Sequence, residues 1–268
     1  MTSPVTDPGS ELFANDKAAR ALEAVYLTAD LVAQRRTVMA LLAAQPGERI
    51  ADVGCGPGLL ALDLAAAVGP AGHVLAVDVS ESMVSMASQR CAGLGYVRTG
   101  QAHASALPAP DGALDALVCT QVLEYVPDAA GALREFARVL RPGGRLLLMD
   151  TDWESCVWHS GDPARMRRII DAWDSHCAHP HLPGRLVPML ADAGFTDVRV
   201  SVHALVTHTR FAGTFCEGMI DSLSRHAVRT AQVDAETVAG WRDDLLRFDA
   251  DGRTFFSLNR HLFIAVRA

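Results

Sequence analysis

Hydrophobic and polar positions alternate along this chain with two periods, one typical of helices and one typical of buried strands. Between residues 46 and 150, short apolar runs are each followed by polar turns or by helical spacing. The runs predict strands at residues 49–53, 73–77, 96–99, 113–120 and 145–149. Helical spacing predicts helices at residues 59–68, 81–91 and 129–140. Several strands are apolar on both faces, so the pattern predicts an α/β fold with a doubly wound, mostly parallel sheet.

Different patterns flank this core. We expect residues 1–15 to be a flexible tail, and residues 16–268 to form one domain. Helical spacing before Pro46-Gly47 predicts an N-terminal lid helix over residues 16–45, ahead of the core at 46–150. After Asp150 further helices are predicted at 163–176, 186–193, 211–229 and 234–248, with strands at 197–204 and 254–266. We interpret two helical insertions as cap segments, residues 151–182 and 205–250.

Composition narrows the classes of partner. The chain has 268 residues, half of them hydrophobic, and a formal net charge of −7. Nucleic-acid binding usually needs a basic stripe that neutralises phosphates, and no Lys/Arg block exceeds Arg35-Arg36 or Arg167-Arg168. No apolar run is long enough to span a bilayer, and the N-terminus lacks the basic start of a signal peptide. With six scattered cysteines and no CxxC pair, we expect a cytoplasmic protein with reduced thiols and with neither nucleic-acid nor membrane partners.

The most specific motif is Asp52–Gly58, which reads DVGCGPG where the first strand ends and a helix begins. This is the crevice at which open α/β sheets bind ligands. Its glycines permit positive φ and close approach of a ligand to the backbone. A dinucleotide-binding loop would carry its third glycine one residue later. Asp52 would repel a pyrophosphate, but it would attract the ammonium and sulfonium groups of S-adenosylmethionine.

A second acid ends the second predicted strand. Asp78 lies 20 residues after Gly58, where it can accept both ribose hydroxyls of an adenosine. Asp78 could instead be only a favourable charge at the start of the next helix. With the glycine loop we favour S-adenosylmethionine as the cofactor. An NAD-dependent oxidoreductase and a turn without a ligand are the alternatives.

Five motifs, in this order, resemble those of class I S-adenosylmethionine-dependent methyltransferases. They are Asp52–Gly58, Asp78, Ser105–Pro108, Asp115–Val126 and Arg138–Met149. The branch they resemble most includes the ubiquinone/menaquinone C-methyltransferases and the arsenite methyltransferases. The resemblance covers about residues 45–150. It implies a Rossmann-like, seven-stranded sheet whose last strand, residues 254–266, is antiparallel.

The resemblance also implies a set of cofactor-binding residues. Some surround the methionine end, two lie at the ribose, two at the adenine edge, and three wall the pocket after the fourth strand. In that order they are Asp52, Gly54, Cys55, Gly56 and Gly58; Asp78 and Val79; His103 and Ala104; and Thr120, Gln121 and Val122. The family often has an acid where this chain has His103.

The acceptor site is less determined by sequence. Methyl transfer from a sulfonium depends mainly on proximity and in-line alignment, and a base is needed only if the acceptor must lose a proton. His159 is our candidate base, and Asp152 is a candidate acid that orients it. Tyr26, Trp153 and Trp158 are candidate substrate-binding residues, because aromatic walls suit a small amphipathic or cationic molecule.

Other interpretations concern metals, arsenic and catalysis itself. Three histidines, His176, His179 and His181, share a proline-containing loop without a fourth ligand, so we predict no metal. Three cysteines outside the core motifs could bind arsenite, although isolated buried thiols are the simpler interpretation; they are Cys156, Cys177 and Cys216. A non-catalytic S-adenosylmethionine-binding protein would share the cofactor motifs. We predict methyl transfer to a small organic molecule at an N, O or C atom; a homodimer is compatible with the sequence.

Overall fold

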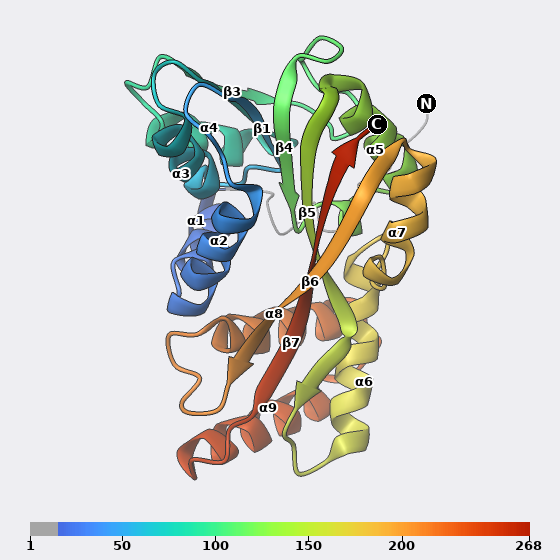
Figure 1. Cartoon of the computed structure of the whole chain (residues 1–268). Coiled ribbons are helices and arrows are strands. Elements are labelled where there is room, and N and C mark those ends of the chain that lie inside the picture. The colour runs from blue at the N-terminus through green and yellow to red at the C-terminus, as the bar shows by residue number, and fades with distance from the viewer. Residues whose placement is uncertain (1–15) are drawn as a thin grey trace, which may run out of the picture.

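Seven strands form one twisted sheet with helices on both faces (Figure 1). The structure is a computed structural model that describes residues 16–268, so the predicted tail at 1–15 lies outside the described residues. The strand order is β3-β2-β1-β4-β5-β7-β6. Neighbouring strands are parallel up to β5, whereas β7 is antiparallel to both β5 and β6. The predicted doubly wound sheet with an antiparallel last strand is confirmed.

The strands have unequal lengths. In chain order they are β1 Arg49–Val53, β2 His73–Asp78, β3 Val97–Gln101, β4 Leu114–Thr120, β5 Leu140–Trp158, β6 Phe195–Thr207 and β7 Phe256–Arg267. Asp52 on β1 lies beside Ala76 on β2 and Val118 on β4. Because the central strands are parallel and in register, β1, β2 and β4 end at the same edge, as ligand-binding α/β sheets require.

Nine α-helices surround the sheet within the described residues. They are α1 Asp16–Tyr26, α2 Ala29–Leu42, α3 Leu59–Val68, α4 Glu81–Arg90, α5 Ala129–Val139, α6 Pro163–Trp173, α7 Pro183–Asp192, α8 Phe215–Arg229 and α9 Ala235–Ala250. The single helix expected before residue 45 is broken into α1 and α2. Thr28 is extended there, and its hydroxyl donates to the Val25 carbonyl over 2.7 Å, which closes a turn between the two helices.

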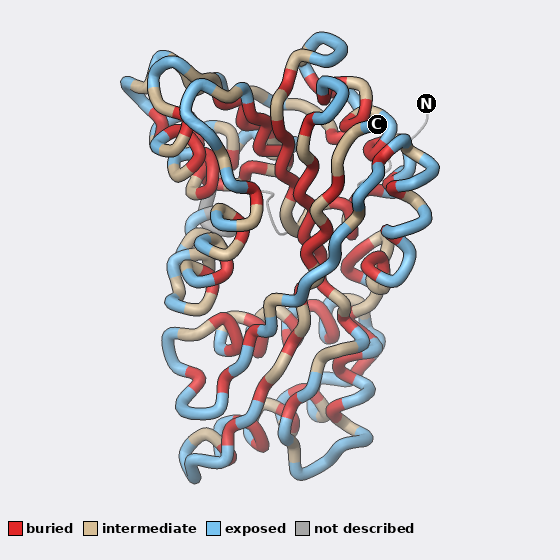
Figure 2. The backbone as a smooth tube through the Cα atoms, in the orientation of Figure 1, coloured by how far each residue is buried: buried red, intermediate tan, exposed pale blue. Residues whose placement is uncertain are grey.

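Each face of the sheet has its own apolar core. Residues such as Phe136 of α5 and Leu186 of α7 pack on one face. Val38 of α2 and Leu64 of α3 pack on the other, with α4 beside them. Figure 2 shows the central strands buried, whereas the edge strand β6 is largely exposed. This two-sided covering explains why the central strands are apolar on both faces.

The fifth strand is much longer than the sequence pattern predicts. We expected it to end at Met149, but it continues to Trp158 because β7 pairs with it along its length, from Arg145↔Val266 to Trp158↔Phe256. The register is irregular between Asp152 and Val157. The segment from residue 151 therefore begins as a strand extension and becomes helical only at α6.

The ends of β5, β6 and β7 extend beyond the core and lie against α6, α8 and α9 (Figure 1). A third apolar cluster fills this part, with Ile169, Leu223 and Trp241 among its buried members. It draws on both segments that we interpreted as caps. Within residues 16–268, no helix combines the length and the apolar character needed to cross a bilayer.

Candidate active site

The turn after β1 requires its glycines. The backbone N–H groups of Gly54 and Cys55 donate to the Val77 carbonyl over 2.8 and 2.9 Å, which ties the turn to the end of β2. Gly54 has φ +73°, and a Cβ there would lie 2.1 Å from Cγ2 of Val122. Gly58 has φ +81°, and a Cβ there would lie 2.7 Å from the Ala87 backbone. At Gly54 and Gly58 the neighbours are thus too close for a side chain, and without side chains there a ligand can approach the loop backbone.

Asp52 is a buried carboxylate without a counter-charge. It is 1 % exposed, and its Oδ2 has no hydrogen-bond partner among the described residues. Burial, followed by the nearby charge of Asp78, raises the pKa of Asp52 to about 7. An uncompensated buried charge is unfavourable, and a cationic ligand group would relieve it. This orphaned oxygen fits the ammonium of the methionine end of S-adenosylmethionine and would disfavour a pyrophosphate.

Asp78 holds the glycine loop from the end of β2. Its Oδ2 accepts from the Gly56 N–H and its Oδ1 from the Ser80 N–H, each over 2.9 Å. Burial raises the pKa of Asp78, and these backbone N–H donors oppose that shift. Each oxygen keeps a lone pair that could accept a ribose hydroxyl. Val79, the next residue, is 50 % exposed, so its apolar side chain is accessible to a ligand.

The predicted adenine edge lies in the loop after β3. Ala104 is buried, and Nδ1 of His103 hydrogen-bonds with the Ser105 hydroxyl over 2.7 Å. The ring of His103 is thus held by its own loop. Recognition of adenine by His103 and Ala104 stays a prediction.

One cavity is lined by the glycine loop, by the helices that precede β1 and by β7. The strand ends and the start of α3 form one side, and the N-terminal helices with β7 form the other. Its lining includes Gly54, Cys55, Gly56, Leu60, Thr120, Gln121 and Met149 on the first side, and Tyr26, Leu31, Gln34, Arg35, Val38 and Arg260 on the second. The structure therefore brings Tyr26, Thr120 and Gln121 together with the glycine loop, as the sequence predicts for one pocket.

Gln121 is held in a strained conformation at this cavity. Its φ is +58°, in the left-handed region that residues with a Cβ rarely adopt. The Gln121 N–H donates to the Met149 carbonyl over 2.7 Å, and its Oε1 accepts from the Thr151 hydroxyl over 2.7 Å. Its buried Nε2 has no partner among the described residues. Such strain with a free donor is typical of a ligand-binding position.

Two buried carboxylates lie beside this position, and our sequence analysis did not single them out. Glu124 and Asp150 are 1 % and 0 % exposed. The Glu124 N–H donates to Oδ1 of Asp150 over 3.4 Å, and the Trp153 indole donates to Oε2 of Glu124 over 3.0 Å. Burial raises the pKa of both carboxyls, and the charge of Glu124 raises that of Asp150 further. The available signal was an acid just beyond the ends of the predicted fourth and fifth strands, 113–120 and 145–149.

Arg260 of β7 is a further buried charged residue that our sequence analysis did not single out. It is 5 % exposed and stands with its guanidinium carbon 4.7 Å from the centre of the Phe215 ring. One Nη1–H donates to Oε1 of Gln34, whereas Nε has no partner among the described residues. A buried cation thus lines the same cavity as the glycine loop. The sequence does not reveal this burial, because alternating side chains of a strand point to opposite faces and Arg260 could equally have faced the solvent.

The strand extension carries two predicted residues away from the cavity. Trp158 packs edge-on against Phe256 and Trp241, with ring centres 4.7 and 5.6 Å apart. His159 is exposed, and its Nδ1 hydrogen-bonds with the Arg253 carbonyl over 2.9 Å, beside the Phe248 ring. Neither residue lines the described cavity. We therefore no longer assign substrate binding to Trp158 or proton transfer to His159.

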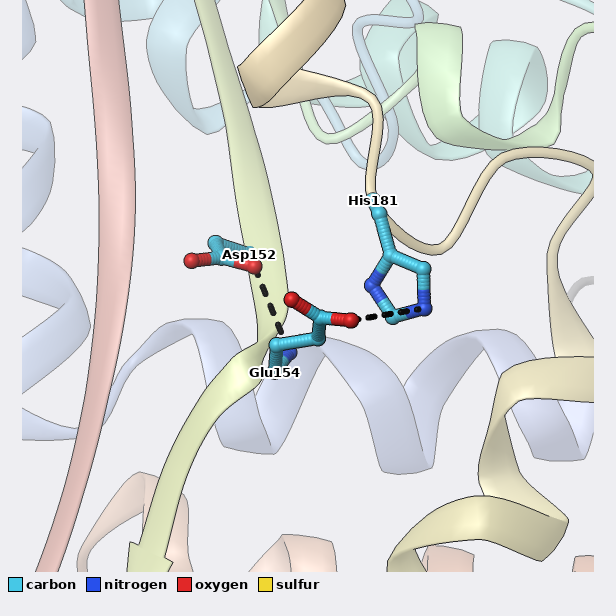
Figure 3. Close-up of side chains that lie close together, drawn as sticks. All are labelled: Asp152, Glu154 and His181. Carbon is cyan, nitrogen blue, oxygen red and sulfur yellow. Dashed lines mark hydrogen bonds and ion pairs between the residues drawn. The ribbon is translucent and has the colours of Figure 1, made fainter.

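Asp152 belongs to a different group of polar side chains (Figure 3). Its Oδ1 accepts from the Glu154 N–H over 3.3 Å, and the Glu154 carboxylate points toward His181, 3.8 Å from Nε2. His181 also lies 3.5 Å from Asp174. The contacts of His181 with Glu154 and Asp174 account for this partly exposed group, and no described hydrogen bond connects Asp152 to His159. We withdraw Asp152 as the orienting acid.

The cysteines do not form a thiol site. Among the described residues, Asp152, Glu154 and His181 are the only three ligand-type side chains found close enough together to share an ion, so Cys156, Cys177 and Cys216 do not converge. Burial raises the pKa of the Cys156 thiol to about 12 and also raises that of the other two. Thiols that stay protonated are poor ligands for arsenic or metal.

Comparisons with known proteins agree with this geometry. A family model described as a methyltransferase domain matches residues 51–148. A demethylmenaquinone methyltransferase of Listeria welshimeri is 32% identical over an alignment of 197 residues that covers 66% of this chain and 84% of the relative. A 37.1 kDa protein in transposon TN4556 of Streptomyces fradiae is 38% identical over 170 residues, 63% of this chain. The chain matches about half of that relative, 49% of its length.

Solved structures show the same fold at low identity. Phosphoethanolamine N-methyltransferase 2 of Haemonchus contortus, in complex with S-adenosyl-L-methionine, has a TM-score of 0.65 at 17% identity, over 100% of this chain and 61% of that chain. The YcgJ protein of Bacillus subtilis has a TM-score of 0.61 at 21% identity, over 87% and 97%. Taken with the relative matched over most of its length, these findings show that the chain belongs to the class I S-adenosylmethionine-dependent methyltransferases.

Proposed function

We propose that this methyltransferase acts on a small organic molecule bound between the sheet edge and the N-terminal helices. The observation that carries the proposal is the shared cavity, in which Gly54 and Thr120 face Tyr26 and Arg260. A pocket walled from several sides accommodates a small acceptor more readily than a polymer. The net charge of −7 also disfavours nucleic acid as a substrate.

Different residues at the strand ends would bind different parts of the cofactor. When bound, S-adenosylmethionine supplies a methyl group that its sulfonium already activates. Asp52 would neutralise the ammonium, and Asp78 would accept the ribose hydroxyls while it keeps Gly56 in place. The free N–H groups at the start of α3 would bind the carboxylate. Val79, His103 and Ala104 would surround the adenine.

The acceptor side of the cavity provides alignment, and the buried carboxylate of Glu124, beyond the end of β4, is a candidate base. Tyr26 and α2 would exclude water and hold the acceptor in line with the methyl group, which supplies most of the rate enhancement in such a reaction. Glu124 lies three residues beyond Gln121, and its raised pKa makes it a better proton acceptor than an ordinary carboxylate. The Trp153 indole fixes its orientation. We propose Glu124 as the base in place of His159.

The test is to follow a labelled methyl group. The full-length protein is incubated with S-adenosylmethionine labelled in the methyl group and with a bacterial cell extract, and the products are separated by ultrafiltration. Label is expected in the small-molecule fraction, and an Asp78→Ala variant should give none. Label that accumulates only in protein or nucleic acid would contradict the proposal. Tight cofactor binding without any transfer would favour the non-catalytic alternative.

A further inference from the structure

We infer that Arg260 binds a carboxylate of the methyl acceptor, so that the substrate is a small organic acid with an apolar body. The inference rests on the proposed function and specifies its substrate class. Its basis is a buried arginine that lines the cavity and whose Nε has no hydrogen-bond partner among the described residues.

The described hydrogen bonds of Arg260 leave the Nε and Nη2 atoms of its guanidinium without partners. Nη1 is occupied by Oε1 of Gln34, and the Phe215 ring lies beneath the guanidinium plane. Nε is buried without a partner, and no described hydrogen bond uses Nη2. No ion pair within the described residues involves Arg260; the charge of Glu124, and after it those of Tyr26, Tyr125 and Asp30, raise its pKa against the effect of burial. Nε and Nη2 therefore form an available pair of donors.

A carboxylate matches this pair of donors in shape and charge. The Nε–H and Nη2–H bonds of arginine are nearly parallel, and the two oxygens of a carboxylate can accept both. Burial lowers the pKa of Arg260 because it disfavours the charged form, and a bound anion would restore that balance. A neutral amide presents only one oxygen and adds donors that Arg260 cannot accept.

The sheet order favours the acceptor over the cofactor as the source of this carboxylate. The glycine loop follows β1, whereas Arg260 is on β7, with β4 and β5 between them. Adjacent strands lie about 4.8 Å apart, so three strand spacings separate the backbones of β1 and β7 by roughly 14 Å. The cofactor's own carboxylate has nearer donors at the start of α3. Arg260 also contacts Phe215 of α8, beside the helices of the cap.

The rest of this side of the cavity is apolar or aromatic. Leu31 and Val38 of α2 line it with Met149 of β5, and Tyr26 stands near Gly56. These side chains offer an apolar surface to an aryl or alkyl group. Arg35, the other cation on the cavity wall, already donates from Nε to Asp63 over 2.8 Å. An aryl- or alkyl-substituted acid therefore fits the lining.

The first experiment compares acids with their amides. Binding of 3-phenylpropionate and salicylate, and of the matching amides, is measured by calorimetry on the full chain in the presence of S-adenosylhomocysteine. We expect the acids to bind about tenfold more tightly than the amides. Arg260→Gln should abolish the preference and Arg260→Lys should reduce it. Arg35→Gln removes the same charge from the same cavity and should retain it, which separates a specific contact from general attraction.

The second experiment tests whether the carboxylate that Arg260 binds belongs to the cofactor instead of the acceptor. S-adenosylhomocysteine and 5′-methylthioadenosine, which lacks the amino-acid tail, are titrated into the wild type and Arg260→Gln. If Arg260 binds the acceptor, both nucleosides keep their affinities in the variant. Loss of affinity for S-adenosylhomocysteine alone would overturn the inference, as would amides that bind the wild type as tightly as acids. Either result leaves the proposed function intact, which fails only if no small molecule receives the labelled methyl group.

Discussion

The indole Nε1 of Trp153 donates to Oε2 of Glu124 over 3.0 Å, although Trp153 lies on the extension of β5 and Glu124 lies beyond the end of β4. Both side chains are buried. The backbone of Glu124 also accepts from the His179 N–H over 2.9 Å, in the loop before α7. The strand extension thus holds the carboxylate that we propose as the base, and the loop before α7 holds the backbone of the same residue.

Replacing Trp153 by Phe should destabilise the protein through Glu124. The ring would still pack edge-on against Trp173, but Oε2 of Glu124 would lose its donor. We expect the free energy of unfolding to fall by about 1–3 kcal/mol in urea denaturation. Trp173→Phe is the matched control, because the buried Nε1 of Trp173 has no described partner and only packing is lost. Equal losses in the two variants would contradict the role of the hydrogen bond.

The pKa of Asp52 predicts how the stability of the ligand-free protein varies with pH. Burial raises this pKa from 3.8 to about 7, so the folded state holds a proton that the unfolded chain releases. The resulting stability is present below pH 3.8 and is lost as the pH rises to about 7. Asp52→Asn should remove this part of the dependence, up to about 4 kcal/mol. Chemical unfolding of both proteins at a series of pH values measures this dependence. If the free energy of unfolding varies with pH equally in the wild type and in Asp52→Asn, Asp52 ionises normally.

The same carboxylate predicts a pH dependence of cofactor binding. Only ionised Asp52 attracts the ammonium group, so the affinity for S-adenosylmethionine should increase as the pH rises toward 7. The effect should be about tenfold per pH unit at most. Calorimetry on the wild type and Asp52→Asn checks this, and the variant should bind weakly with little pH dependence. A variant that follows the wild-type curve would assign the titration to another group.

Gly54→Ala should prevent cofactor binding. The new Cβ would lie 2.1 Å from Val122, at φ +73°, so the loop or its neighbour must move. Gly69→Ala is a control with a positive φ but open space around it, and it should cost about 1–2 kcal/mol without affecting binding. Thermal unfolding and titration with S-adenosylhomocysteine separate the two effects. Normal binding by Gly54→Ala would refute the close-packing argument.

Glu124→Gln should lower turnover if the acceptor must lose a proton. The amide keeps an oxygen that can accept from Trp153 but cannot take up a proton, so kcat should fall by about 10²–10⁴-fold. His159→Gln should change kcat little, because His159 is exposed and its Nδ1 hydrogen-bonds with the Arg253 carbonyl, beyond the end of β5. Initial rates with an acceptor found by methyl labelling measure both. A large loss in His159→Gln alone would restore our sequence-based assignment.

The central sheet and the glycine loop could be predicted because each is encoded by neighbouring residues. Apolar runs on both faces indicate buried parallel strands, and Asp52 stands two residues before Gly54 at a strand end. Such signals can be recognised in the sequence alone, because a strand, a turn and a helix start are each formed by consecutive residues. The cavity position of Tyr26 was harder to infer, since it depends on the break between α1 and α2 at Thr28.

The acceptor side was decided by tertiary structure. Gln34, Glu124, Asp150 and Arg260 come from four distant segments, and each resembles an ordinary surface residue in the sequence. Burial makes their charges significant, because desolvation raises the cost of an unpaired charge, and burial depends on what the rest of the chain places above them. The same holds for His159: pairing between β5 and β7 extends the strand and carries that side chain beyond the cavity.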